Sequence, residues 1–151
     1  MFHGAVKNKD VKDIKSILVF GDMNSPLIPP RILSLKELCN NIVVVTNADC
    51  RKVVESNFDI VHPPCVRNKT MRYILSSVFT LWLIAKHNPD LIVVHWASRI
   101  WQCFILSLFG KKVIVHTMGG DIDARQDARG WKKFFTSLLL KKCRIVTVKS
   151  Q

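Results

Sequence analysis

Two glycines and an aspartate follow an apolar run that begins at Val113, in the order Gly119, Gly120 and Asp121. Glycines in such a place let a ligand or another chain approach the backbone closely. The carboxylate of Asp121 then has two possible roles. It can cap the start of a helix, a role that Asp123 fits equally well, or it can accept hydrogen bonds from the hydroxyls of a sugar.

A histidine and a tryptophan, His95 and Trp96, end the preceding apolar run. A histidine at the end of a strand can serve as a general base or contact a sugar. A tryptophan beside it can stack on the apolar face of a sugar ring. The structural alternative is a histidine satisfied by backbone groups and a tryptophan that only packs, and the residue types alone leave both open.

Apolar runs and helical periodicities alternate along the chain. The runs are short and rich in β-branched residues, and they predict strands at residues 16–21, 42–46, 58–61, 91–96, 113–116 and 144–148. Apolar residues at helical spacing predict helices at 31–39, 70–87, 97–109 and 131–142, with a weaker helical turn at 49–56. Gly110 is expected to cap the helix before it.

Alternating strands and helices imply right-handed βαβ units. The predicted fold class is therefore α/β, a Rossmann-like parallel sheet with helices on both faces. Nearly half of the residues are apolar (48%), which suits strands buried on both sides. Ligands of such sheets bind beyond the carboxyl ends of the strands near a topological switch point, which directs attention to the loops after Gly21, His95 and His116.

A length of 151 residues corresponds to one domain. Residues 1–15 are polar and are predicted to form an amino-terminal extension, and residues 16–151 form the Rossmann-like domain. Five cysteines without a C-x-x-C pair indicate neither a disulfide framework nor a zinc knuckle, as expected in a reducing compartment. The most apolar stretch, 73–85, is too short to span a bilayer. These features predict a cytoplasmic protein.

The formal net charge of +12 would attract nucleic acid, anionic lipid headgroups or phosphorylated substrates. A nucleic-acid-binding module is the main rival from another functional class. The cations are spread along the chain and no RNA-binding signature occurs, which disfavours a nucleic-acid partner. The predicted last helix carries Lys132, Lys133, Lys141 and Lys142 around an apolar face. It either lies at an anionic membrane surface, which would place the protein at the inner face of the membrane, or is an ordinary crossover helix.

Four segments together resemble GT-B glycosyltransferases of the group called glycosyltransferase family 4. DLIVVHWA (90–97) and VIVHTMGGDI (113–122) are similar to the family's paired landmarks, D-(apolar)-V-H-x-H-W and (apolar)-T-x-H-G-x-D. RIVTVKS (144–150) is similar to the family's following strand, and ILVFGDMNSP (17–26) resembles the first strand and loop of some members. The likeness covers most of the chain from Ile17 onward and rests on the order of these short motifs.

The resemblance implies an enzyme that transfers a hexose from a nucleotide sugar to a lipid-linked or saccharide acceptor, without a cofactor or a tightly bound metal. This chain would be its amino-terminal, acceptor-side domain. The carboxy-terminal donor domain is expected to be absent, so the chain alone is expected to be inactive. The expected catalytic residues are His95 and Asp121, and the expected acceptor-binding residues are Asp22, Asn24, Ser25, Trp96, Gly119 and Gly120.

The sequence departs from the family pattern at two places. Met118 stands where the family has a histidine, and His116, two residues earlier, is expected to point elsewhere. The glycine pair after the first strand is reduced to Gly21 and Asp22. These departures imply either an inactive site or a subgroup with a different acceptor. Two alternatives stay open beside the enzyme, a glycosyltransferase remnant and a basic binding module for nucleic acid or an anionic membrane surface.

Other nucleotide-binding folds are disfavoured. A nicotinamide-binding domain needs G-x-G-x-x-G after its first strand, and no such sequence or Walker A sequence occurs. The spacing of His95, His116 and Asp121 matches no known metal site.

Overall fold

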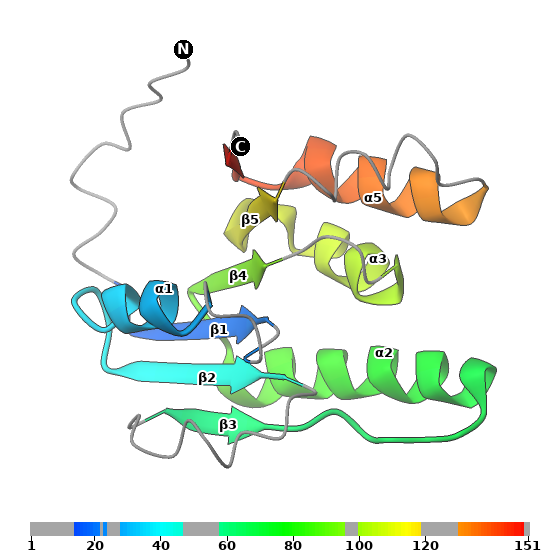
Figure 1. Ribbon diagram of the computed structural model, residues 1–151, viewed down its shortest axis with the longest axis horizontal. Helices are drawn as coiled ribbons and strands as arrows, with labels where there is room; N and C mark the ends of the chain where they lie inside the picture. The colour runs from blue at the N-terminus through cyan, green and yellow to red at the C-terminus, as the bar shows by residue number, and fades with distance from the viewer. Residues whose placement is uncertain are drawn as a thin grey trace.

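The computed structural model describes residues 14–21, 23, 28–46, 58–95, 100–118 and 130–149. Within these residues six strands form one parallel sheet in the order β3-β2-β1-β4-β5-β6 (Figure 1). The strands are β1 (Ser16–Phe20), β2 (Asn41–Val45), β3 (Asp59–Val61), β4 (Leu91–His95), β5 (Val113–Met118) and β6 (Ile145–Lys149). The predicted Rossmann-like α/β fold is confirmed.

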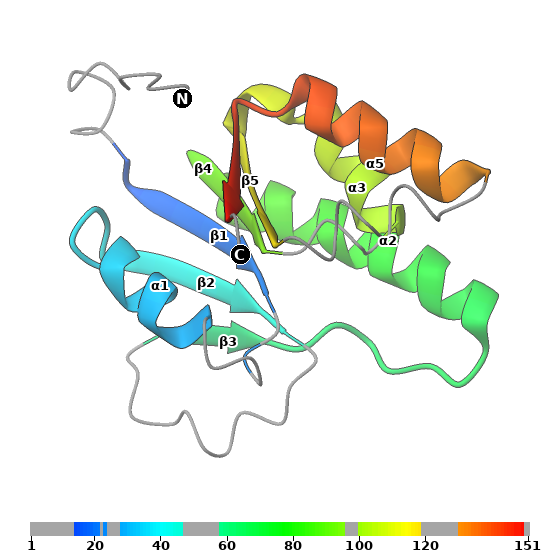
Figure 2. The same ribbon diagram turned by 45° about the horizontal axis from the view of Figure 1, so that its top comes forward.

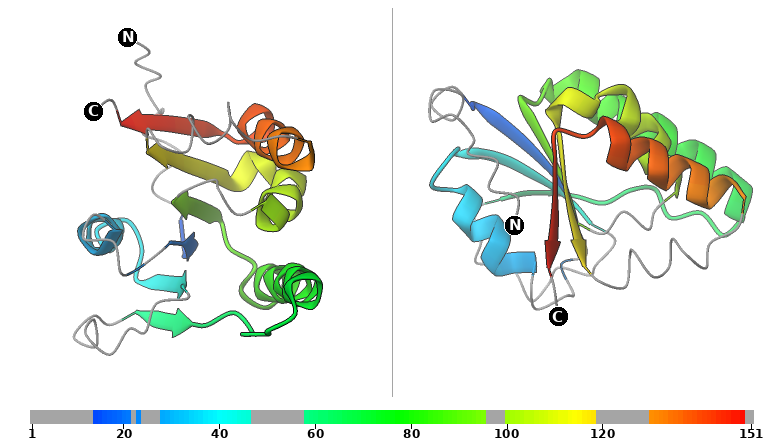
Figure 3. Two further views of the ribbon diagram at one scale, coloured as in Figure 1. Left: turned by 45° about the vertical axis from the view of Figure 1, so that its right-hand side comes forward. Right: turned by 90° about the horizontal axis from the view of Figure 1, so that it is seen from above.

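The helices cover the two faces of the sheet unequally. They are α1 (Ile28–Leu35), α2 (Lys69–His87), α3 (Ile100–Leu108) and α5 (Trp131–Lys142), with a short 3₁₀ turn, η2 (Gly110–Lys112), after α3. In Figures 2 and 3, α1 lies on one face, and α2, α3 and α5 lie side by side on the other. Helix α3 is the middle one of the three and contacts both neighbours.

The core has two layers because successive strand residues point to opposite faces. On the three-helix side, Leu18 and Ile92 of the strands pack in one cluster with Leu83 of α2 and Leu106 of α3. The second cluster lies on the α1 side. It joins Ile17, Val19, Leu91 and Val93 to Ile28 and Ile32 of α1. Strands that are apolar at every position are what a sheet covered on both sides requires.

Helix α1 begins earlier than predicted, at Ile28 instead of residue 31, and ends at Leu35 instead of residue 39. Its first turn contains Pro29 and Pro30, where the missing N–H groups remove no intrahelical hydrogen bond. Ile28 and Ile32, one turn apart, are both fully buried. The two isoleucines hold α1 against the sheet.

Helix α2 ends where the sequence predicts. The Asn68 side chain accepts hydrogen bonds from the backbone N–H groups of Thr70 and Met71, at 3.0 and 3.2 Å. At the other end Asn88 adopts the left-handed conformation with φ 38° and donates its N–H to the carbonyl of Ile84. Asparagine tolerates this conformation better than most residues, and the following proline cannot continue the helix.

The predicted role of Gly110 as a helix cap is wrong. Among the described residues only Asn88 and Gly130 have positive φ, so Gly110 does not adopt the left-handed conformation of such a cap. A Cβ at Gly110 would instead collide with the backbone carbonyl of Lys142. The residue is glycine because the end of α5 passes directly over it. The predicted turn at 49–56 lies outside the described residues.

Candidate functional site

The topological switch point of the sheet lies between β1 and β4. From β1 the chain proceeds outward through β2 and β3, and from β4 it proceeds in the opposite direction through β5 and β6. In open parallel sheets, ligands bind outside the carboxyl ends of the two strands that meet at this point. Gly21 follows β1 and His95 ends β4, so both lie at that edge.

His95 is a buried polar residue at this edge. Its side chain is 5% exposed, and within the described part of the chain neither ring nitrogen has a hydrogen-bond partner. Burial lowers the pKa of His95 to about 4, with smaller contributions from His116 and the positive charge of Arg31. The imidazole is therefore neutral at pH 7. A neutral ring has one donor nitrogen and one acceptor nitrogen to offer a ligand.

His116 lies beside His95, which corrects the expectation that it points elsewhere. The two residues are paired in the register of β4 and β5, and paired residues of neighbouring strands project from the same face. Their rings stack with centroids 4.9 Å apart and planes inclined by 12°. Burial, and then the charge of Arg31, lower the pKa of His116 as well.

Gly21 lets the backbone pass directly against His95. A Cβ at Gly21 would lie 3.5 Å from Cδ2 of His95 and 3.1 Å from Cγ2 of Ile28. A side chain at residue 21 would thus touch the histidine at ordinary contact distance and press more closely on Ile28. Gly21 joins β1, β4 and α1 at one corner of the sheet.

Sequence reasoning missed Arg31 as a member of this site. Arg31 belongs to α1, which follows β1 and therefore starts at the carboxyl edge of the sheet, and its charge acts on both histidines. The sequence predicted the start of this helix three residues too late, and for this reason the place of Arg31 near the site was missed. The available signal was a lone cation directly after the Pro29–Pro30 pair.

Most of the predicted site lies outside the described residues. This holds for Asp121 and for the expected acceptor-binding residues Asp22, Asn24, Ser25, Trp96, Gly119 and Gly120. The structure therefore brings together His95, His116, Gly21 and the charge of Arg31. Within the described ranges no group of three or more His, Cys, Asp or Glu residues could hold a metal ion.

The lysines of α5 belong to the other face of the sheet. Lys133, Lys141 and Lys142 are exposed, and Lys132 lies in the first turn of the helix. On the inner side of α5, Leu139 is fully buried in the core. The helix thus covers the sheet as a crossover helix and also presents lysines to solvent. In the described part of the chain no helix is long and apolar enough to cross a membrane.

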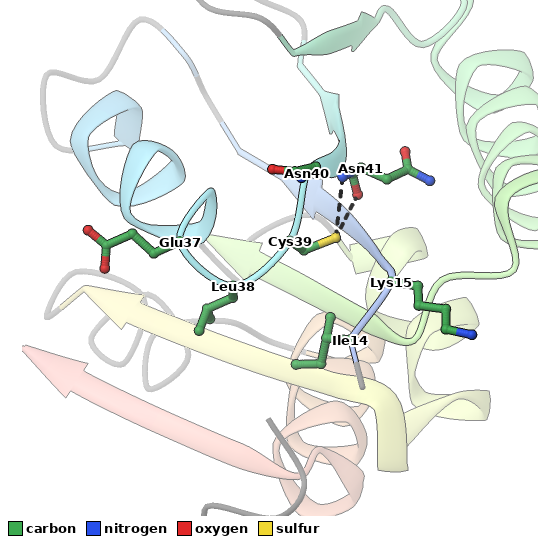
Figure 4. A pocket seen from close by; sticks show the side chains of 7 residues that line it. All are labelled: Ile14, Lys15, Glu37, Leu38, Cys39, Asn40 and Asn41. Atoms are coloured by element: carbon green, nitrogen blue, oxygen red, sulfur yellow. Dashed lines mark hydrogen bonds between the residues drawn. The ribbon is translucent and has the colours of Figure 1, made fainter. Parts of the chain in front are cut away.

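A pocket of about 400 Å³ lies at the opposite edge of the sheet from His95 (Figure 4). It lies where β1 and β2 begin, and its lining is Ile14, Lys15, Glu37, Leu38, Cys39, Asn40 and Asn41. The Cys39 thiol bonds to the backbone of Asn41 at 3.3 and 3.4 Å, which fixes the turn before β2. Its place at the amino ends of the strands is not where parallel sheets bind ligands.

Solved structures that are similar to this chain include two sugar-nucleotide enzymes. One, described as a UDP-N-acetylglucosamine 2-epimerase from Listeria monocytogenes, matches 89% of the chain with a TM-score of 0.65 and 16% identity. The other, a UDP-GlcNAc 2-epimerase from Methanocaldococcus jannaschii, matches 91% with a TM-score of 0.60 and 11% identity. Both have the GT-B fold. This chain has the fold of a GT-B domain.

The GT-B domain described here spans 39% and 40% of the lengths of those two proteins. No protein-family model and no curated protein matches the sequence. At such low identity the comparison establishes the architecture, and the chemistry has to be argued from the site.

Proposed function

We propose that this GT-B domain is the acceptor side of an enzyme that transfers a hexose from a nucleotide sugar to a lipid-linked or saccharide acceptor. The observation that carries the proposal is His95, a neutral, buried imidazole without a partner among the described residues, at the switch point of the sheet. Both similar proteins are named as enzymes that act on the nucleotide sugar UDP-GlcNAc, which supports a sugar-related function for this domain.

In the proposed reaction His95 acts as the general base. An acceptor hydroxyl gives its proton to the imidazole as its oxygen forms a bond to the anomeric carbon of the donor. The bond from that carbon to the phosphate oxygen breaks, and the nucleoside diphosphate leaves with the electron pair. The neutral ring of His95 is in the form that accepts a proton, and the lowered pKa of the stacked His116 favours the uncharged form of this neighbour.

The remaining residues are assigned to acceptor binding. Asp121 is proposed to stabilise the imidazolium that forms. The proposed contacts to the acceptor are Asp22, Asn24, Ser25, Trp96, Gly119 and Gly120. The nucleotide-sugar donor would be bound by a second domain. The two similar proteins are long enough to contain one, since this chain matches 39% and 40% of their lengths. If the acceptor is lipid-linked, the lysines Lys132, Lys133, Lys141 and Lys142 would contact anionic headgroups.

The test is a titration followed by NMR of the histidine side chains. The 151-residue chain, with ¹³C-labelled histidine, receives octyl glucoside below its micelle concentration or UDP-GlcNAc. We expect the glucoside to shift the imidazole signals of His95 and His116, and His95→Gln to weaken binding about tenfold or more. His87→Gln is the matched control, since His87 ends α2 at the opposite edge of the sheet.

The outcome distinguishes two sugar-related functions. A shift by UDP-GlcNAc instead of the glucoside would refute the acceptor-side role and favour a nucleotide-sugar epimerase, as the names of the similar structures suggest. If His95→Gln and His87→Gln weakened glucoside binding equally, His95 would have no specific role in sugar binding. With UDP-glucose as donor the chain alone is predicted to transfer no sugar, and measurable transfer would refute the proposed division of labour.

A further inference from the structure

Large apolar side chains are exposed mainly on the three-helix face. The described residues include ten exposed large apolar side chains, and only Leu33 and Leu38 of these lie in or next to α1. The other eight are Met71, Ile74, Val78, Leu81 and Trp82 on α2, Phe104 and Leu108 on α3, and Phe134 on α5. These eight residues are called the outer apolar surface below.

Helix α2 contributes most of this surface. Its exposed apolar residues recur at intervals of three and four, at Met71, Ile74, Val78 and Leu81, which places them along one side of the helix. Ile74 and Val78 are 52% and 58% exposed. At 100° per residue the buried Leu83 and Ile84 lie on the other side, in the core. The helix therefore has two apolar sides, of which the sheet uses one.

The charged residues of the described helices on this face all have one sign. The segments that form α2, α3, η2 and α5 contain no aspartate or glutamate. Arg72 and Lys86 on α2 are exposed, as are Lys133, Lys141 and Lys142 on α5. The Lys86 ammonium lies 4.8 Å from the centre of the Trp82 ring, so a cation borders the outer apolar surface directly.

We propose that the outer apolar surface is a docking site for an anionic lipid membrane. Helices that lie in the membrane interface combine a face rich in Trp, Phe and Leu with flanking Lys and Arg, and their binding grows with apolar area and with attraction to anionic lipids. Here α2 would place its outer side chains at the headgroup level while Lys86 of α2 and Lys141 of α5, which lies on one face of that helix with Phe134, contact lipid phosphates. The surface is separate from the His95 site and does not depend on the proposed sugar chemistry.

A second copy of the chain fits the surface poorly. Two copies that met through this surface would bring the exposed Lys86 and Lys141 of both into one interface, and α2, α3 and α5 have no carboxylate to neutralise them. Like charges across such a seam oppose pairing. Nucleic acid fits poorly too, because the exposed leucines and isoleucine would face its phosphates. An anionic lipid surface can bind both the outer apolar surface and the cations beside it.

The test is sedimentation of the 151-residue chain with lipid vesicles. We expect it to bind vesicles of mixed phosphatidylcholine and phosphatidylglycerol at least about tenfold more tightly than pure phosphatidylcholine, because cations near an anionic surface contribute about 1 kcal/mol each. Replacing both Lys86 and Lys141 by Gln should weaken binding about thirtyfold on the same basis. Lys15→Gln, at an exposed cation near the start of β1, is the charge control.

The apolar part is tested by the double variant Ile74→Gln and Val78→Gln, with Leu33→Gln as the matched control. Leu33 is 49% exposed, close to the exposure of the two α2 residues, but it lies on the opposite face of the sheet. We expect the double variant to weaken vesicle binding about tenfold or more, since two apolar side chains no longer enter the interface. The control should bind as the wild type does, and all variants should unfold at the wild-type temperature.

Three outcomes would overturn the proposal. They are no binding to either kind of vesicle, equal loss of binding in Leu33→Gln and in the α2 variants, and a lipid-free dimer that the Ile74→Gln and Val78→Gln variant dissociates. The last result would make α2 a subunit interface. None of these results bears on saccharide binding at His95, so the two proposals can fail separately.

Discussion

The two faces of the sheet are built from the same strands and yet differ in character. On the α1 face, the strand positions that hold Leu91 and Val93 lead to His95, whose ring lies next to Gly21. On the other face, the positions of Ile92 and Val94 lead only into an apolar core beneath three helices. The two faces therefore differ in role. The face covered by α1 alone holds the candidate site at His95, and the face covered by three helices holds the larger apolar core and the proposed membrane contact.

The largest expected effect tests the two sides of α2. Leu83→Ala removes a fully buried side chain from the core and should lower the free energy of unfolding by about 2–5 kcal/mol. Leu81→Ala, two residues away and 41% exposed, should change it by less than about 0.5 kcal/mol. Urea unfolding followed by circular dichroism measures both. Similar losses in the two variants would mean that the outer side of α2 is covered.

A second prediction concerns the buried histidine of the α1 face. Its pKa is lowered to about 4 in the folded chain from an ordinary value of 6.5, so the unfolded chain binds more protons between these pH values. Stability is therefore fully present above pH 6.5 and is lost as the pH falls toward 4, by about 3 kcal/mol from this residue. Urea titrations across that range should show a flatter profile for His95→Leu. Parallel profiles would contradict the burial of a neutral imidazole.

The smallest expected effect compares one glycine from each face. Gly110→Ala forces a Cβ against the rigid backbone of Lys142 and should destabilise the chain by about 1–3 kcal/mol. Gly21→Ala meets only the side chains of Ile28 and His95, which can give way, so its cost should be below about 1 kcal/mol. Thermal unfolding measures which of the two variants loses more stability. The Gly21 variant should also shift the His95 imidazole signal, whereas Gly110→Ala should leave it unchanged.

Much of the fold was predictable from local patterns. The runs that form β1, β2, β4 and β5 are apolar at nearly every position, and such runs make sense only in a parallel sheet covered on both sides. The Asn88–Pro89 pair predicted the end of α2 correctly, because backbone conformation there depends on the residues themselves. The start of α1 was predicted three residues late, because a proline pair can lie inside a first turn as well as before it.

The candidate site was predictable only in part. The sequence determined that His95 ends a buried strand at the ligand-binding edge, since strand order and handedness follow from βαβ connections. It did not determine that His116 stacks on His95, because this requires the register between β4 and β5. It did not reveal the charge of Arg31, which reaches both histidines only after α1 folds back on the sheet.

The sequence by itself determined the order of elements, the parallel sheet and the excess of positive charge, because each depends on residue type and spacing. Only the tertiary structure decided which apolar residues of α2 face the core, because a helix with two apolar sides offers the same periodicity on each. It also decided why residue 110 is glycine, since the collision with Lys142 joins residues far apart in the chain. Contacts of that kind have no local signal.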